Sequence, residues 1–191
     1  MPGRQAKMLS EIVIRRSLKT LERRPSFLRD RVIFLLSVRA GLRACEISGL
    51  DWAMVVDANG RVNHLLDVRD SIAKKRSGRR IPMHAELRSA LSAYGRTCER
   101  VGPVIISQRS ERMLANSIVN WFIALYAQVG AEGCSSHSGR RTFITQAARR
   151  AHRAGASLRD VQILAGHRSI EVTQGYIDGD SDAQRRLIRL L

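Results

Sequence analysis

The sequence predicts a mainly helical fold with a small three-stranded antiparallel sheet, which places it in the α+β class. Two observations lead to this prediction. Apolar residues recur at helical spacing along most of the 191-residue chain, whereas residues 53–83 carry the alternating pattern and the turn residues of short strands. Hydrophobic residues make up 44% of the chain, which is enough to bury a core, so disorder is not expected.

Three helices are expected before the sheet. The first covers residues 7–24 and ends where Pro25 follows two arginines. The second begins after Ser26, a plausible N-cap, and stops at Gly41. The third is short and covers about residues 43–50. The inner side of the first helix is expected to carry Ile12, Ile14, Leu18 and Leu21.

The sheet is expected from three short runs, residues 53–57, 64–69 and 79–83. Asn59-Gly60 is a strong hairpin turn between the first two, because both residues tolerate positive φ. Pro82 cannot donate a ladder hydrogen bond, so the third strand is an edge strand or ends there. A basic loop, residues 74–80, precedes this strand and holds five cations but no acid.

Helices dominate the rest of the chain. One short apolar run, residues 104–106, is expected to be a buried extended segment. The expected helices cover residues 85–99, 115–129, 135–153, 158–165, 169–177 and 181–191.

The charge balance narrows the function. The chain has 33 Lys and Arg against 17 Asp and Glu, a formal net charge of +16 and a pI of about 11.4. Arginine dominates the basic set, and its planar guanidinium binds phosphates through two parallel hydrogen bonds. A polyanionic partner is therefore expected, with DNA or RNA ahead of a membrane surface. The alternative is a soluble protein that is merely basic.

Cysteine spacing and hydropathy exclude other classes. Cys45, Cys98 and Cys134 are odd in number and widely spaced, so neither a disulfide framework nor a zinc site is expected. No apolar run reaches about 18 residues, so no membrane segment is expected. Reduced thiols fit a soluble protein of the cytoplasm.

Two residues in the first half of the chain could serve phosphate chemistry. Arg43 could bind a phosphate, or it could form an ordinary ion pair with Glu46 three residues on. Lys74 could donate a proton, or it could be one of several non-specific phosphate contacts in the basic loop.

Four residues in the last third of the chain could likewise serve phosphate chemistry or have an ordinary structural role. His137 and Arg140 lie three residues apart on one helix face, where capping or solvent exposure is the ordinary role. His167 follows Gly166, at a helix C-terminus where a cation is favoured. Tyr176 is the last aromatic residue, and a tyrosine in such a place is usually half-buried packing.

The order and spacing of these residues strengthen the interpretation that they serve phosphate chemistry. The motifs are, in order, Ala40-Gly41-Leu42-Arg43-x-x-Glu46, Lys74 eight residues before Pro82, His137-x-x-Arg140, Ala165-Gly166-His167, and Tyr176 nine residues after His167. Together with the expected order of helices and strands, this set closely resembles the tyrosine recombinase (phage integrase) family over residues 26–180.

The resemblance implies a site-specific recombinase that cleaves and rejoins DNA through a 3′-phosphotyrosine, without metal, ATP or other cofactor. Tyr176 would be the nucleophile. A phenol ionises only near pH 10 or so, and a dense set of cations lowers the energy of its anion. Arg43 and Arg140 would hold the nonbridging phosphate oxygens, and His167 would donate a further hydrogen bond to them. Glu46 would orient this set from behind.

The resemblance also assigns the proton transfers. His137 would handle the proton of the tyrosine. Lys74 would protonate the leaving 5′-oxygen, with Lys75 as the alternative.

The implied partner is double-stranded DNA with specific recombination sites. A tetramer on two duplexes, accessory DNA-bending proteins and a nucleoid-associated place in the cytoplasm would accompany that role. Integration, excision and inversion all fit the sequence. Residues expected to contact DNA are Lys75, Arg76, Arg79, Arg141, Arg149 and Arg168.

Two alternative functions stay open. One is a catalytically weak or inactive DNA-binding protein that retains the fold, and the other is a DNA-relaxing enzyme with the same chemistry. The chain also departs from the family pattern, with Gly139 and Arg141 where the family usually has Leu and His, and Ala165 where it usually has Leu. Glycine at position 139 is expected to loosen its helix start by about 1 kcal/mol relative to alanine.

The expected division is an N-terminal helical extension over residues 1–25, a catalytic domain over 26–180 and a helical tail over 181–191. About 25 residues are too few for a separate DNA-binding domain, so we expect a short, catalytic-domain-only member that binds DNA weakly by itself. The apolar tail would pack either on its own core or on a neighbouring subunit.

Overall fold

The computed structural model describes residues 6–74, 76–109, 111–176 and 188–189. The chain divides into two compact units, and the division falls inside helix α6, between Phe143 and Ile144. Unit 1 holds α1 to α5, the sheet and the start of α6, and unit 2 holds the rest of α6, α7 and α8.

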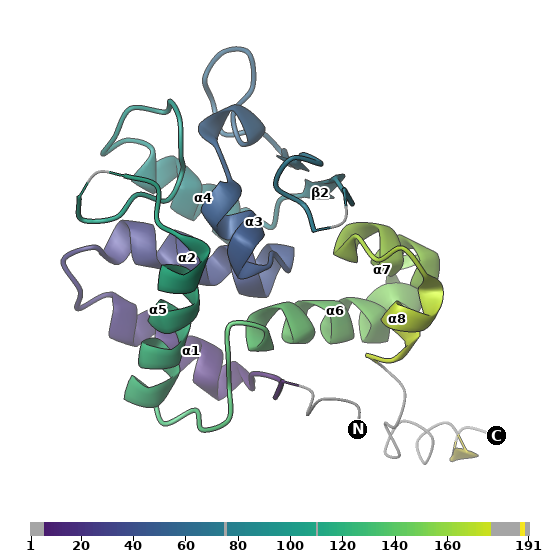
Figure 1. Cartoon of the computed structure of the whole chain (residues 1–191). Coiled ribbons are helices and arrows are strands. Elements are labelled where there is room, and N and C mark those ends of the chain that lie inside the picture. The colour runs from purple at the N-terminus through teal and green to yellow at the C-terminus, as the bar shows by residue number, and fades with distance from the viewer. Residues whose placement is uncertain (1–5, 75, 110, 177–187, 190–191) are drawn as a thin grey trace. The chain divides into compact units, whose positions relative to one another are not determined.

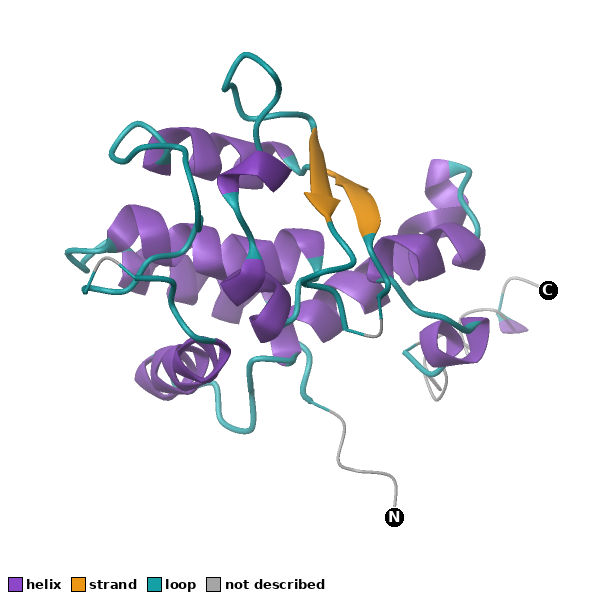
Figure 2. Cartoon of the chain, turned by 45° about the horizontal axis from the view of Figure 1, so that its top comes forward, coloured by secondary structure: helices purple, strands orange, loops and turns teal. Residues whose placement is uncertain are grey.

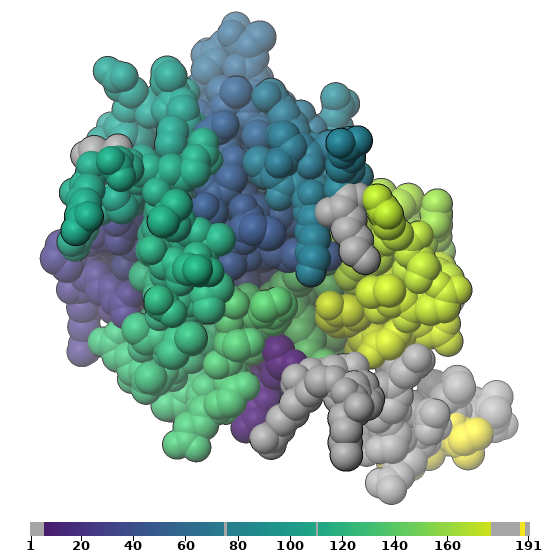
Figure 3. Space-filling model, viewed as in Figure 1, coloured from purple at the N-terminus to yellow at the C-terminus, as the bar shows by residue number. Residues whose placement is uncertain are grey.

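Unit 1 is built around helix α2, as Figure 1 shows. This helix is buried along most of its length because Val32 to Leu36 are all apolar and fully enclosed. In the space-filling view of Figure 3, side chains cover the face of this unit that is turned to the viewer. The helices that begin in unit 1 are α1 (Glu11–Leu21), α2 (Phe27–Ala40), α3 (Ala44–Gly49), α4 (Ala85–Tyr94), α5 (Ala115–Gln128) and α6 (Ser138–Ala151).

Helix α1 is shorter than expected and is tied to distant parts of unit 1. Ser10 caps it by accepting a hydrogen bond from Val13 N, whereas Ser26 before α2 makes no such side-chain bond. Just before α1, Leu9 N donates to Thr142 Oγ1 at 2.8 Å, which joins this end of the chain to α6. Ile14 and Leu21 are buried as expected, but Ile12 is 63% exposed, so its expected inward position was wrong.

The sheet has two strands rather than three (Figure 2). Strand β1 (Leu65–Val68) pairs antiparallel with β2 (Arg79–Pro82), and β2 ends at its proline as expected. The strand expected over 53–57 was wrong. Trp52 instead begins a single 3-10 turn, Trp52–Met54, because its buried indole packs against Tyr94 and turns the chain.

The Asn59-Gly60 turn is present even though no strand leads into it. Gly60 has φ +70°, and Asp57 N donates to Arg61 O at 2.8 Å across the turn. A single antiparallel bridge between Val56 and Val62 is all the pairing that follows. The expected buried segment is also present, since Val104 and Ile105 are fully enclosed outside any helix.

Unit 2 continues from α6 through a short 3-10 turn, His152–Ala154. It then forms α7 (Leu158–Ala165) and α8 (Ile170–Gln174), which pack on each other. The expected helix over 181–191 lies outside the described residues apart from 188–189. Within the part of the chain that the structure describes, every helix is too short or too polar to cross a bilayer.

Candidate functional site

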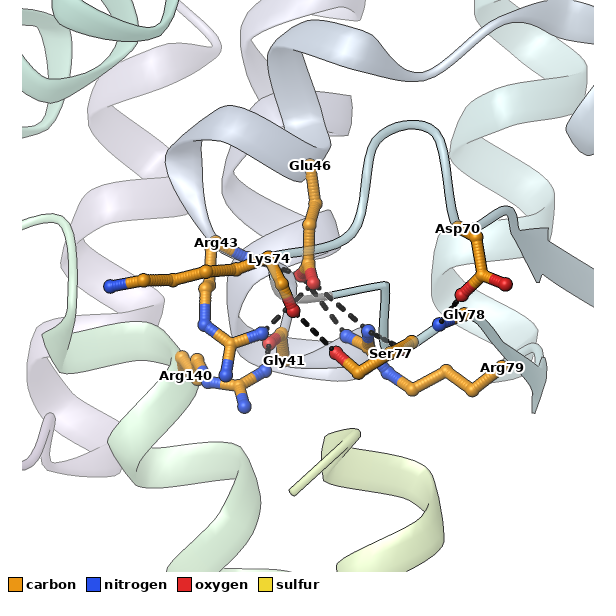
Figure 4. Close-up of polar contacts among 9 residues, drawn as sticks. All are labelled: Gly41, Arg43, Glu46, Asp70, Lys74, Ser77, Gly78, Arg79 and Arg140. Carbon is orange, nitrogen blue, oxygen red and sulfur yellow. Dashed lines mark hydrogen bonds and ion pairs between the residues drawn. The ribbon is translucent and has the colours of Figure 1, made fainter. Parts of the chain in front are cut away.

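Glu46 is the centre of the polar cluster in unit 1. It is the third residue of α3, its side chain is fully buried, and its two carboxylate oxygens accept from two arginines (Figure 4). Arg43 Nη1 donates to Oε1 at 2.9 Å, and Arg79 donates through Nη1 and Nη2 at 2.9 and 3.0 Å. The Arg43 backbone N–H adds a fourth bond, to Oε2 at 2.9 Å.

This arrangement fixes the charge of Glu46. Burial by itself would raise the pKa of the Glu46 carboxyl, but the hydrogen bonds and charge of Arg79, followed by those of Arg43, outweigh burial and lower it. Glu46 is therefore a carboxylate at neutral pH. Its charge holds Arg43 at the start of α3. The ion pair that was expected as the ordinary role of Arg43 is therefore present, and the Arg43 side chain is still 21% exposed.

Arg140 reaches the same part of unit 1 from helix α6. Its Nη1 donates to Gly41 O at 2.6 Å, and Gly41 precedes Arg43 by two residues. Gly41 ends α2 in a left-handed conformation, φ +65°, and a Cβ at this position would overlap the ring of Phe143. The glycine therefore lets α6 approach closely enough for Arg140 to bond here.

Lys74 lies in the loop between the strands. Its side chain is exposed and points away from the Glu46 carboxylate in Figure 4. The loop is internally bonded, because Gly78 N donates to Asp70 Oδ1 at 2.7 Å and Ser77 Oγ donates to Lys74 O at 2.9 Å. Ile72 anchors it on α3, where a Cβ at Gly49 would come within 2.6 Å of Ile72 Cγ2.

His137 stands just before α6 and is exposed. Its carbonyl accepts from Arg141 N at 2.9 Å, so it begins the helical pattern that Arg140 continues. Gly139 between them lies directly against α2. A Cβ there would overlap Ser37 Oγ and come within 3.1 Å of Val38 Cγ1, which gives a packing reason for glycine that the sequence did not reveal.

Unit 2 brings His167 and Tyr176 together. Their ring centroids are 5.4 Å apart and the planes are inclined by 25°. Gly166 ends α7 at φ +63° and turns the chain, and Gln162 Nε2 then donates to His167 O at 3.0 Å. Thr173, buried on α8, places its Oγ1 2.9 Å from His167 Nδ1.

The residues expected to contact DNA fall into different environments. Arg76, Arg149 and Arg168 are exposed, and Arg141 is half-buried. Lys75 lies outside the described residues. Arg79 is buried on Glu46, a position that its charge alone did not suggest. The sequence feature that could have revealed this burial is the alternation of side chains along the strand, which puts Arg79 and Ile81 on one face and Arg80 on the other.

The fold is that of tyrosine recombinases. The crystal structure of the XerA recombinase superposes with a TM-score of 0.76 at 23% sequence identity, covering all of this chain and 65% of that one. The Tn1549 transposon integrase, solved in complex with circular intermediate DNA, gives a TM-score of 0.75 at 20% identity, covering all of this chain and 69% of that one.

The chain belongs to the phage integrase family. The model of that family matches residues 7–182. The tyrosine recombinase XerC of Myxococcus xanthus is 31% identical over 160 residues, which is 78% of this chain and 50% of the relative. XerC of Rhodospirillum centenum is 28% identical over 160 residues, 81% of this chain and 44% of the relative. The chain thus spans about half the length of these curated relatives.

Proposed function

We propose that this chain cleaves and rejoins DNA as a site-specific recombinase, through a 3′-phosphotyrosine formed at Tyr176. The observation that carries the proposal is the stacking of Tyr176 on His167, 5.4 Å between ring centroids, in a member of the phage integrase family. A protein that only binds DNA needs no phenol beside an imidazole. The DNA complexes of its structural neighbours, such as the lambda integrase dimer bound to a core site, support DNA as the substrate.

The proposed step is an in-line displacement at one phosphodiester. The Tyr176 oxygen forms a bond to phosphorus while the bond to the 5′-oxygen of the next nucleotide breaks. His137 accepts the phenolic proton, and Lys74 donates a proton to the leaving 5′-oxygen. The reverse step attacks the phosphotyrosine with a 5′-hydroxyl and regenerates the phenol. Bond number and charge balance in both directions, so no energy source is consumed.

The cations of the site would stabilise the charge that builds on the nonbridging oxygens. Arg43 and Arg140 are suited to this because Glu46 and the Gly41 carbonyl fix them in place before DNA arrives. His167 would add a hydrogen bond from Nε2. A Thr173 hydroxyl that donates to Nδ1 keeps the imidazole proton on Nε2, where the phosphate needs it.

The wider assembly follows from the same proposal. Strand exchange requires two duplexes and four cleavage events, so a tetramer on specific recombination sites is the expected active form, with DNA-bending proteins as accessories. Such an enzyme works at the nucleoid. Exposed Arg76, Arg149 and Arg168 would contribute phosphate contacts and a steep salt dependence of binding.

Covalent capture tests the proposal. The full chain is incubated with a library of nicked duplexes whose central segment is randomised, so that a cleaved strand loses its short 5′-hydroxyl fragment and cannot be rejoined. We expect a protein–DNA adduct that survives denaturing electrophoresis, and we expect Tyr176→Phe to abolish it while DNA binding persists.

Tyr126→Phe is the matched control. The Tyr126 hydroxyl is buried without a hydrogen-bond partner, so its removal leaves the fold and the adduct intact. A wild-type chain that binds these duplexes and forms no adduct is instead a DNA-binding protein that retains the fold. Relaxation of supercoiled plasmid without any preferred sequence would identify a relaxing enzyme.

A further inference from the structure

Arg79 occupies the inner face of strand β2. The register pairs it with Val68 and pairs Ile81 with Leu66, and all four side chains are buried on one side of the two-stranded sheet. The neighbouring Arg80 points outward with a 75% exposed side chain. One strand therefore carries two adjacent arginines in opposite environments, and only the inner one meets Glu46.

The contact between Arg79 and Glu46 is a buried bidentate pair. Both Nη atoms donate to the carboxylate, at 2.9 and 3.0 Å, and the two side chains are 2% and 0% exposed. A fork of this kind is strong and fixed in orientation. The same carboxylate holds the side chain and the backbone of Arg43. Glu46 thus links the start of β2 to the start of α3.

The start of β2 is also the end of the loop that carries Lys74. Arg79 Nη1 lies 3.5 Å from Ser77 O, and Ser77 Oγ bonds to Lys74 O. Gly78, next to Arg79, bonds to Asp70 at the opposite side of the loop. A shift of Arg79 would be passed through these contacts to Lys74.

We infer that Arg79 is a positioning residue that does not contact DNA phosphates. Through its bonds to Glu46, it fixes where Arg43 and the Lys74 loop lie relative to each other. This inference rests on the proposed function, since it names what holds that site together. It replaces the DNA contact that the charge of Arg79 suggested from the sequence.

Burial argues against a phosphate contact. To reach DNA, the Arg79 guanidinium would have to leave a carboxylate that it holds with both Nη atoms. Glu46 would then keep only Arg43, and a buried charge that loses its main partner is strongly unfavourable. Exposed arginines such as Arg80 meet no such obstacle.

Two measurements distinguish the roles, with Arg79→Met compared with the adjacent Arg80→Met. The first is the salt dependence of binding to the duplex library, by fluorescence anisotropy. A phosphate contact that is lost reduces the log–log slope by about 0.9. We expect Arg79→Met to keep the wild-type slope. A slope reduced by that amount overturns the inference, even for a chain that never cleaves DNA.

The second measurement is the single-turnover cleavage rate of a duplex recovered from the library, at saturating protein. We expect Arg79→Met to cleave about 10- to 100-fold more slowly, as is typical when a residue that orients another functional group is removed, and Arg80→Met to cleave at the wild-type rate. Equal rates for wild type and Arg79→Met overturn the inference while leaving the proposed function in place. Absence of a wild-type adduct contradicts the proposed function instead.

A sulfur leaving group identifies which step Arg79 supports. A thiol with a pKa of about 8.5 leaves without protonation, so a duplex with a bridging 5′-sulfur does not need Lys74. We expect this substrate to recover part of the rate lost in Arg79→Met. No recovery at all overturns the link to Lys74. Should Arg79→Met fail to fold, Arg79→Lys serves as the second variant. It keeps the charge but not the two parallel hydrogen bonds, so we expect an intermediate rate.

Discussion

Glu46 is a buried side chain whose charge is balanced by its neighbours. The carboxylate is fully enclosed, yet it is charged because three guanidinium nitrogens and one backbone N–H surround it. The cluster of Arg43, Glu46 and Arg79 keeps a net positive charge, which suits a phosphate. Removing the carboxylate would leave two arginines facing each other across a buried space.

Acid should therefore weaken unit 1 through Glu46. Because its pKa is lowered on folding, its contribution to stability is complete above the unfolded value of about 4.3 and is lost as the pH falls through the lower folded value. We expect Glu46→Gln to unfold more easily by about 3 kcal/mol at pH 7. The deficit should narrow below about pH 4, because wild type then loses the same charge. Urea unfolding across the acid range measures this.

Asp67→Asn is the control, since Asp67 is 44% exposed and its ion pairs with Arg69 and Arg80 are 3.7 and 3.9 Å long. Exposed pairs of this kind contribute about 0–1 kcal/mol, so this variant should follow wild type. If the unfolding free energies of Glu46→Gln and wild type changed in parallel at every pH, the lowered pKa of Glu46 would make no contribution to stability.

Helix α6 illustrates a position that is set by packing between elements. Its first turn lies so close to α2 that Gly139 leaves no room for a Cβ beside Ser37. The Ser37 hydroxyl is itself buried without a hydrogen-bond partner. Helix propensity alone marked Gly139 as a weakness, whereas the contact with α2 makes it the residue that fits.

Gly139→Ala should lower stability in spite of the better helix propensity of alanine. The overlap with Ser37 should cost about 1–3 kcal/mol, as overpacking usually does. Ser37→Ala alone should be nearly neutral, because it removes an unpaired hydroxyl, and the double variant should lose less than Gly139→Ala.

Gly175→Ala is the comparison, because the nearest atom to a Cβ there is 3.6 Å away. Denaturant unfolding of the four variants decides the matter. If Gly139→Ala were as stable as wild type, α2 would have made room for the new Cβ at little cost in free energy.

Local patterns predicted the elements with strong periodicity. Helix α7 was expected at residues 158–165 and lies at Leu158–Ala165, and both strands that flank Lys74 were expected within one residue of each bound. The strand expected over 53–57 failed because tertiary packing decided it, through Trp52 against Tyr94. The burial of Arg79 and the fit of Gly139 depend on contacts between segments distant in sequence, which one sequence does not reveal.

At the scale of the whole molecule, the candidate residues belong to both units. Unit 1 holds Arg43, Glu46, Lys74, His137 and Arg140, and unit 2 holds His167 and Tyr176. The sequence connected the two groups only through the family resemblance. Our proposal is that both act on one phosphate.

The identity of the linked residue tests that claim most directly. The adduct is digested with nuclease and trypsin, and the peptides are analysed by mass spectrometry. Cleavage after Arg168 and Arg185 gives the peptide 169–185, in which Tyr176 is the sole tyrosine. We predict that this peptide carries a nucleoside 3′-phosphate in wild type and that Arg43→Met, altered in unit 1, forms little of it. A nucleotide on any other peptide, or undiminished labelling in Arg43→Met, would contradict the account.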